Sequence, residues 1–267
     1  MSKMKAIKTF RDLLSFLTII SLGKTEDFIL TSAEYMFLFP LIGAFIGLLG
    51  AAYFLVCRFV AAYLLAFINS IVFVPTEFLL KLVPAVMTLA FLLVLTGLQH
   101  FDGLVDLGNA VGMDSMEKRR VIAHAWIVTY KGAVLAIFVE FLAVLGLFFL
   151  STDFALRTII VSEVAAKLSM VTIAAIGKPT HKGLGSLFLE KAKRKRSIAA
   201  YLLSVLIVYP LLGFIGVGVI LISILLGIFM ERVANSVFGG VSGDVIGATD
   251  ETARAITLVF VASVLAL

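Results

Sequence analysis

The sequence predicts an all-α protein, a polytopic integral membrane helical bundle of about seven transmembrane helices. Hydrophobic residues make up 61% of the 267 residues and charged residues only 15%, and the mean hydropathy is +1.13. A soluble globular domain has about a quarter charged residues. The apolar residues also form runs that are long enough to cross a bilayer. We therefore expect a single integral membrane domain over residues 1–267.

Residues 1–30 predict an amphipathic segment on the cytoplasmic surface of the membrane, ahead of a transmembrane bundle over 31–267. Four basic residues between positions 3 and 11 precede a short apolar run over 13–22. Asp12 interrupts this pattern and no clear small-residue cleavage site follows. We therefore interpret the segment as a retained surface helix and not as a signal peptide.

Apolar runs and a short last helix account for the predicted bundle. Residues 61–80 are apolar but interrupted by Asn69, Pro75 and Glu77, and they fit either a short extracellular hairpin or a tilted partial span. Glycines just after Pro210 predict a turn that divides an over-long apolar run into two spans. The predicted spans are 35–59, 81–98, 130–150, 156–176, 198–213 and 216–234, followed by the last helix over 255–267.

Two features of the first span bear on packing and on metal chemistry. Gly43 and Gly47 have the small-xxx-small spacing that permits close helix contact within the chain or, in a homo-oligomer, between chains. Cys57 is the only cysteine, which excludes a disulfide framework and a cysteine-rich metal site.

The basic residues predict the orientation of the chain. Of 22 Lys and Arg residues, five lie in 1–24, three in 118–120 and seven in 178–196. The positive-inside rule places these three segments in the cytoplasm. Counting spans from an inside N-terminus gives the same result, and it also places the polar, glycine-rich stretch 239–254, expected to be a loop, on that side. The polar segments are thus predicted to meet at one face of the membrane.

The stretch 99–109 places two carboxylates and an amide directly after an apolar run. In a helix, Asp102, Asp106 and Asn109 occupy positions i, i+4 and i+7, which lie within roughly 60° of one another. Carboxylates combined with substrate phosphates are typical ligands of Mg²⁺. The stripe predicts a site for a hard cation and a phosphate-bearing ligand; the alternative is that these acids only solvate a helix end.

A second polar stretch combines glycines with acids. Gly239, Gly240 and Gly243 permit close backbone approach and expose amides to anions. Asp244 and Glu251 are seven residues apart and would share one face of a helix. With the two aspartates of the first stretch they would complete a two-cation site of the kind used for displacement at phosphorus. The alternative is a flexible loop between spans.

A third stretch, 178–185, combines basic residues with glycines. Further basic residues over 191–196 fit a topogenic or lipid-facing cluster better than a ligand site. His100 and His124 are more often structural than catalytic in such positions, and both roles stay open. The residues suited to phosphate recognition are Lys178, His181, Lys182, Gly183 and Gly185.

Three charged residues lie inside predicted spans. Glu140, Glu163 and Lys167 should face inward and pair, because a charge at the bilayer centre costs about 2.5–3.5 kcal/mol on insertion scales. Glu163 and Lys167 are four residues apart and can pair on one helix face. They would line a polar cavity for a large substrate or, alternatively, form the coupling site of a transporter.

Together these segments resemble the cobalamin synthase family, the adenosylcobinamide-GDP ribazoletransferases of corrinoid assembly. The resemblance extends over about residues 30–260 in the same order. Asn109 stands where the family usually has an aspartate, and Arg254 where an acid is common. The matching motifs are Phe39-Pro40-x-x-Gly43-x-x-x-Gly47, His100-x-Asp102-Gly103-Leu104-x-Asp106-x-x-Asn109, Thr129-Tyr130, Lys182-Gly183-Leu184-Gly185 and Gly239-Gly240-Val241-Ser242-Gly243-Asp244-Val245-Ile246-Gly247-Ala248.

The resemblance implies a magnesium-dependent transfer by a multi-pass enzyme of the cell membrane, without any nucleic acid. A hydroxyl of α-ribazole, or of α-ribazole 5′-phosphate, attacks the phosphorus nearest the corrinoid of adenosylcobinamide-GDP, and GMP leaves. Asp102, Asp106 and Asp244 are the expected Mg²⁺ ligands, and Asp106 or Glu251 the expected acceptor of the hydroxyl proton. The expected substrate-binding residues are His100, Asn109, Lys178, His181, Lys182, Gly183, Gly185, Gly239, Gly240 and Gly243.

Two alternative functions stay open from the residues themselves. A CDP-alcohol-type membrane phosphotransferase also begins its motif with Asp-Gly, but Ala-Arg would follow the glycine where this chain has Leu104-Val105. A membrane transporter would instead depend on Glu140, Glu163 and Lys167, so neutralising these three residues would abolish its activity.

Overall fold

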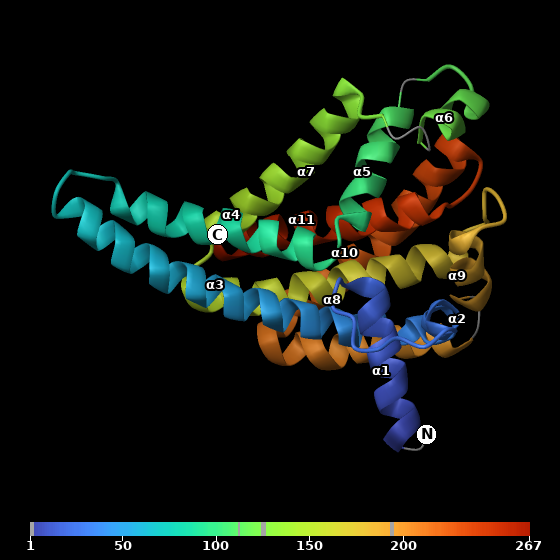
Figure 1. Cartoon of the computed structure of the whole chain (residues 1–267), viewed down its shortest axis with the longest axis horizontal. Coiled ribbons are helices and arrows are strands. Elements are labelled where there is room, and N and C mark those ends of the chain that lie inside the picture. The colour runs from blue at the N-terminus through green and yellow to red at the C-terminus, as the bar shows by residue number, and fades with distance from the viewer. Residues whose placement is uncertain (1–2, 112, 124–126, 193–194) are drawn as a thin grey trace.

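The computed structural model describes residues 3–111, 113–123, 127–192 and 195–267, and helices form nearly all of them (Figure 1). Among the described residues, five helices are long and apolar enough to cross a membrane, by length and composition. These five are α3 (Phe39–Asn69), α4 (Thr76–Leu95), α7 (Tyr130–Phe149), α8 (Thr152–Ile176) and α10 (Ile198–Phe238). The others are α1 (Lys3–Leu17), α2 (Phe28–Glu34), α5 (Gln99–Ala110), α6 (Met116–Ala123), α9 (Leu184–Ala192) and α11 (Gly243–Leu265), with 3-10 turns over Met36–Leu38 and Lys195–Ser197.

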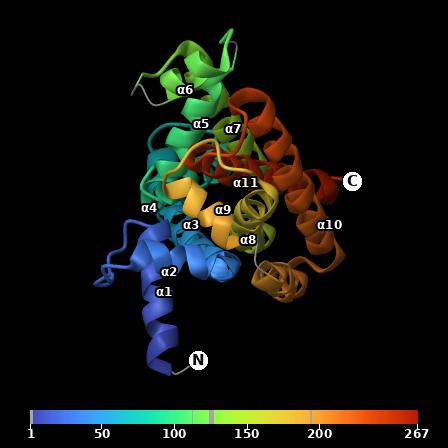
Figure 2. The same ribbon diagram turned by 90° about the vertical axis from the view of Figure 1, so that its right-hand side faces the viewer.

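Helix α8 is the centre of the bundle. Every residue from 161 to 174 is buried, and Figure 2 shows α8 surrounded by α3, α10 and α11, which all contact it. Small residues let these helices approach closely: a β-carbon added at Gly43 would lie 2.5 Å from the Glu163 carbonyl oxygen, and one at Gly47 would lie 2.6 Å from the Ile160 Cα. The small-xxx-small spacing therefore serves helix packing within the chain.

Helix α10 contains the two spans that the sequence predicts between residues 198 and 234. Gly213 has non-helical backbone angles, φ 57° and ψ −131°. A β-carbon added at Gly216 would lie 2.9 Å from the Val208 carbonyl oxygen, a contact that a continuous helix cannot make across eight residues. The chain therefore folds back at Gly213, and the predicted turn after Pro210 is confirmed.

Residues 61–80 form a helical hairpin and not a tilted partial span. Helix α3 continues to Asn69 without a break, and α4 begins at Thr76. The Arg58 guanidinium donates a hydrogen bond to the Leu80 carbonyl oxygen at 3.2 Å and ties the two helices together. At 31 residues, α3 is about 46 Å long, against a hydrocarbon thickness of about 30 Å. The stretch is therefore the end of one long helix, a short connection and the start of the next.

The expectation that residues 239–254 form a loop is wrong. The turn between α10 and α11 covers only four residues, and α11 runs without a break from Gly243 to Leu265. Ser242 caps this helix, because its side-chain oxygen accepts a hydrogen bond from the Val245 N–H at 3.3 Å. The charges that indicate a loop in the sequence are instead neutralised inside the bundle.

The N-terminal segment is partly built into the bundle. Leu13, Leu14 and Leu17 in the second half of α1 are fully buried, whereas its basic first half projects from the molecule (Figure 1). The Asp12 carboxylate accepts hydrogen bonds from the Thr25 N–H at 3.1 Å and the Thr25 hydroxyl at 3.0 Å. These two bonds fix the chain between α1 and α2.

Candidate functional site

The three polar stretches of the sequence converge at one end of the bundle. Helix α5 touches the start of α11: a β-carbon added at Gly103 would lie 2.3 Å from the Asp244 carbonyl oxygen. The start of α9 reaches the same place, because a β-carbon at Gly185 would lie 2.7 Å from the Gly243 nitrogen. Glycine is required at such close approaches of two backbones. Sequence and structure agree that these segments form one region.

The lysine-glycine stretch pairs with the glycine turn through its backbone. The Val241 N–H donates to the Lys178 carbonyl oxygen at 2.7 Å, and the Thr180 N–H donates to the Val241 carbonyl oxygen at 3.2 Å. The side chains of Lys178, His181 and Lys182 are exposed beside this pairing. The basic side chains and the turn of Gly239 and Gly240 thus border the start of α11.

Asp102, Asp106 and Asp244, here called the acidic cluster, bring three carboxylates together. The pKa of Asp106 is raised to about 7, first by its partial burial and then by the neighbouring Asp102 and Asp244, while the Asn109 side chain opposes the rise. None of the three makes an ion pair with another residue that the structure describes. Close carboxylates that repel one another are suited to an external divalent cation, whose preferred ligands are oxygens.

Asn109 holds the fold together beside the acidic cluster. Its buried side chain donates to the Ile127 carbonyl oxygen at 2.7 Å and accepts from the Thr129 N–H at 2.9 Å and the Thr129 hydroxyl at 2.8 Å. Thr129 in turn caps α7. The amide that was expected to bind substrate is therefore engaged by the segment leading into α7. His124, and residues 193–194 of the basic cluster, lie outside the described residues.

A second group of charges lies deeper, between α8 and α11, and is here called the buried ion network. The Lys167 ammonium lies 2.8 Å and 2.9 Å from the two Asp250 carboxylate oxygens and 3.3 Å from Glu163. Arg254 contacts both Glu163 and Glu251. These side chains are almost completely buried, so the predicted inward pairing of Glu163 and Lys167 is confirmed. The network consists of Glu163, Lys167, Asp250, Glu251 and Arg254.

Glu251 and Glu140 both belong to the surroundings of Arg254. Glu251 was expected to act beside Asp244, but it is 1% exposed and paired with Arg254. Glu140 approaches the same arginine and Glu251 from α7. Arg254 thus interacts with carboxylates from three helices, α7, α8 and α11.

His100 connects the open end of the site with the network. It is 8% exposed, and its Nδ1 lies 2.8 Å from the Asp250 carboxylate. Donor atoms of His100, Asp250 and Glu251 lie within 4.8 Å of one another, a spacing that would suit a metal ion. Lys167 and Arg254 already supply the positive charge there, so this group is an internal ion network rather than a second metal centre.

A cavity of about 170 Å³ opens beside the start of α11. Its polar side includes His100, Gly185, Gly243 and Asp244, and its apolar side includes Phe16, Met36, Phe39, Met170 and Phe188. The rings of Phe16 and Phe188 are stacked with centroids 4.8 Å apart. Apart from Phe39, which belongs to a matching motif, the sequence gives no signal for these apolar residues, because phenylalanine is common throughout the chain. Asp250 was not among the expected site residues, because it lies in a polar stretch whose composition indicates a loop.

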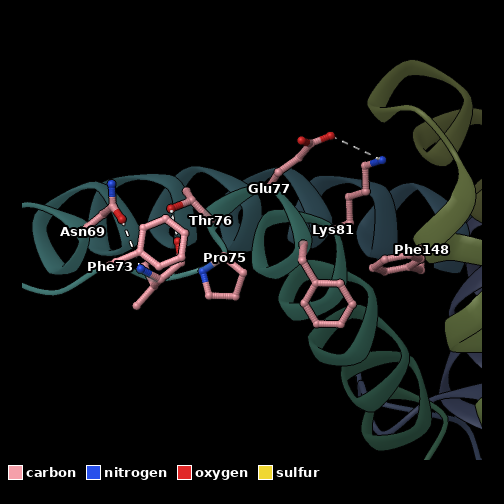
Figure 3. A pocket seen from close by; sticks show the side chains of 9 residues that line it. Asn69, Phe73, Pro75, Thr76, Glu77, Lys81 and Phe148 are labelled. Atoms are coloured by element: carbon pink, nitrogen blue, oxygen red, sulfur yellow. Dashed lines mark hydrogen bonds and ion pairs between the residues drawn. The ribbon is translucent and has the colours of Figure 1, made fainter.

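A hollow of about 580 Å³, larger than the cavity beside α11, lies at the opposite end of the bundle, by the α3–α4 connection (Figure 3). It is lined by Asn69, Phe73 and Phe148, among others, and bordered by an exposed pair of Glu77 and Lys81 with 4.0 Å between the charged atoms. Figure 3 shows these two side chains pointing outward. Size alone would select this hollow, but the converging polar segments are at the other end.

Comparison with known proteins gives consistent matches. A family model described as cobalamin-5-phosphate synthase matches residues 9–262. A protein of Archaeoglobus fulgidus is 29% identical over 261 residues, covering 98% of this chain and 97% of its own. One of Methanococcoides burtonii is 30% identical over 72% of this chain and 74% of its own, and one of Clostridium novyi is 32% identical over 70% and 77%. Each is named adenosylcobinamide-GDP ribazoletransferase. No solved structure matches the chain.

Proposed function

The chain belongs to the cobalamin-5-phosphate synthase family and is an enzyme of cobalamin nucleotide-loop assembly, and we propose that its site joins α-ribazole, or α-ribazole 5′-phosphate, to the corrinoid of adenosylcobinamide-GDP. One observation carries the proposal for the site: the acidic cluster meets glycine amides and lysines at a single end of the bundle. Carboxylates suit a cation, and amides and lysines suit phosphates.

The proposed reaction is a displacement at phosphorus. A hydroxyl oxygen of the ribazole attacks the phosphorus nearest the corrinoid and forms a new P–O bond. The bond from that phosphorus to the oxygen bridging the two phosphates breaks, and GMP leaves with that oxygen. The hydroxyl proton passes to a carboxylate. Of the two expected acceptors, Glu251 is buried and paired with Arg254, so we assign the proton to the partly exposed Asp106.

We also propose that Asp102, Asp106 and Asp244 hold Mg²⁺. The three carboxylates fit the ion, since they are oxygen ligands with no cation of their own among the described residues. When bound, Mg²⁺ would neutralise phosphate charge and stabilise the leaving oxygen. Asp102 and Asp244 would hold the ion between α5 and α11, next to the reacting phosphate, while the hydroxyl proton passes to Asp106.

The remaining expected residues form the proposed phosphate-binding edge. Lys178, His181 and Lys182 provide donors on exposed side chains. The glycines at positions 183, 185, 239, 240 and 243 provide backbone amides or close approach. A β-carbon added at Gly243 would meet nothing within 4 Å, so the edge is open to a large ligand there.

We propose that this end faces the cytoplasm at the cell membrane. Figure 1 shows α1, α6 and α9, whose sequences carry or adjoin the basic residues, on the same side of the molecule as α5 and away from the α3–α4 connection. Positive residues favour the cytoplasmic side, where a soluble guanosine nucleotide would be released. The alternative of a transporter loses its basis, since Glu163 and Lys167 are fully buried and neutralised by Asp250 and Arg254. A homo-oligomer stays a prediction.

The test is an assay of the purified protein in lipid vesicles with adenosylcobinamide-GDP, α-ribazole and Mg²⁺. We expect GMP and a corrinoid with a completed nucleotide loop in equal amounts. Omitting α-ribazole or chelating the divalent cation should stop both products. Folded protein that releases no GMP with any divalent cation would overturn the proposal.

A further inference from the structure

The cavity beside the acidic cluster has a polar side and an aromatic side, and the reaction as described uses only the polar side. Asp244 lines the cavity and also belongs to the acidic cluster. We propose that the aromatic side binds the flat, apolar base of the ribazole substrate. This inference rests on the proposed function and adds to it the position of the acceptor substrate.

The aromatic side is built for a flat ring. Phe16 and Phe188 are stacked at 4.8 Å with 24° between their planes, and Phe39 lies 6.1 Å from Phe188. Met36 and Met170 complete this side. Aromatic rings prefer offset-stacked or edge-to-face neighbours, and thioethers make favourable contacts with ring edges. A planar heterocycle would find both kinds of contact here.

The size of the cavity distinguishes the base from the other parts of the two substrates. At about 170 Å³, it is close to the 150 Å³ cavity known to hold benzene and below the 300–1,000 Å³ typical of drug-sized ligands. A corrinoid macrocycle is therefore too large. Guanine would leave several donors and acceptors against phenylalanine and methionine, and unpaired polar groups are costly to bury. A benzimidazole-type base fits both size and polarity.

The position of the cavity also suits the transfer. From the aromatic side, the ribose of a bound ribazole would extend past Gly243 toward Asp244 and the acidic cluster. His100 lies on this route and is held by Asp250 at 2.8 Å. We assign His100 a positioning role, in which Asp250 fixes the ring so that its other nitrogen faces the cavity. The base pocket and the reaction centre would thus share one continuous space.

The first test compares Phe188→Ala with Phe78→Ala, which removes a ring beside the distant hollow. Phe188→Ala should raise the KM for α-ribazole about tenfold, the loss expected for one aromatic contact, and leave the KM for adenosylcobinamide-GDP within about twofold. Phe78→Ala should change neither constant. An unchanged KM for α-ribazole in folded Phe188→Ala protein would overturn the inference.

Phe16→Leu is a second variant that is expected to fold even if Phe188→Ala does not, because Phe16 is only partly buried and leucine keeps the site apolar. It should raise the KM for α-ribazole in the same direction by a smaller factor. An unchanged KM for α-ribazole in this variant would count against the pocket as well.

A binding experiment separates this inference from the proposed function. Radiolabelled α-ribazole is equilibrated, without the corrinoid substrate, with Asp102→Asn protein, whose turnover should be strongly lowered, and with the same protein carrying Phe188→Ala. Binding that depends on Phe188 supports the pocket even if no GMP is ever released, in which case only the proposed reaction fails. Equal binding by both proteins, alongside normal GMP release by the wild type, overturns the pocket alone.

Discussion

The acidic cluster and the buried ion network share α11 but differ in how their charges are balanced. In the network, Lys167 and Arg254 form ion pairs with three carboxylates at positions that are almost completely buried. In the acidic cluster, three carboxylates are at least partly exposed and make no ion pair among the described residues. Partial burial, followed by the charges of Asp102 and Asp244, raises the pKa of Asp106 to about 7. Among the residues that the structure describes, counter-charges are paired with the first group and not with the second.

The difference follows from the cost of burying charge. A buried carboxylate is tolerated only if a cation and hydrogen bonds compensate its lost hydration. The network meets that requirement internally, so its main contribution is to the folded structure. The acidic cluster is open to solvent and has no ion-pair partner within the described part of the chain, so its charges are available for ligands. Substitutions in the two groups should therefore damage different properties.

The largest effect is expected for Lys167→Met, which leaves Asp250 without its nearest cation. Removing one partner of a buried ion pair typically costs about 3–5 kcal/mol of unfolding free energy. The measurement is denaturant-induced unfolding in detergent. Lys81→Met is the matched control, because its pair with Glu77 is exposed and 4.0 Å apart and should contribute little. Equal stability of the two variants would show that the network is not a structural element.

In contrast to Lys167→Met, Asp102→Asn should lower turnover and leave stability nearly unchanged. Loss of one preorganised charged group at a phosphoryl-transfer site commonly lowers turnover by about 10²–10³-fold, and Asp102 is exposed, so the unfolding free energy should hardly change. GMP release by lipid-reconstituted protein measures the effect. Asp114→Asn, an exposed acid paired with Lys118 at 3.8 Å, is the control and should keep full turnover. An Asp102→Asn variant that is active but unstable would reverse the assignment of the two groups.

A smaller effect is expected for Gly103→Ala, which tests the contact between α5 and α11. The added β-carbon would lie 2.3 Å from the Asp244 carbonyl oxygen, so the helices must separate. Overpacking of this kind costs about 1–3 kcal/mol, and the shift should lower turnover as well. In Gly218→Ala the new atom would meet only the edge of the Phe260 ring at 3.1 Å, which can move. Gly103→Ala should therefore lower both turnover and the unfolding free energy clearly more than Gly218→Ala.

The sequence predicted most of the fold because hydropathy and charge act locally. Runs of apolar residues identified the spans, and the glycines after Pro210 identified the turn at Gly213. The basic residues predicted that the three polar stretches meet, which the contact of Gly103 with Asp244 and of Gly185 with Gly243 confirms. The roles assigned to individual site residues stay predictions.

What could not be predicted depends on contacts between distant residues. Asp250 and Arg254 indicate a loop by composition, but their partners Lys167 and Glu163 are 83 and 91 residues away in the chain and make a buried helix acceptable. The position of Asn109 on the polar stripe predicted a ligand-binding side chain, yet this side chain forms hydrogen bonds with the backbone at Ile127 and Thr129. The phenylalanines of the cavity could not be distinguished by composition from the many other apolar residues of the chain.

The smallest effect is expected for Lys182→Ala at the exposed phosphate-binding edge. A solvent-exposed charge interacts weakly and is screened by salt within about 10 Å at 0.1 M ionic strength. The KM for adenosylcobinamide-GDP should therefore rise about threefold to tenfold at low salt and by less at high salt, with turnover retained. Lys81→Ala, at the opposite end, should leave both values unchanged. Lys167 and Lys182 carry the same charge and differ in burial. A loss of stability in Lys182→Ala that does not depend on salt would therefore contradict the view that buried lysines stabilise the fold and exposed lysines bind the ligand.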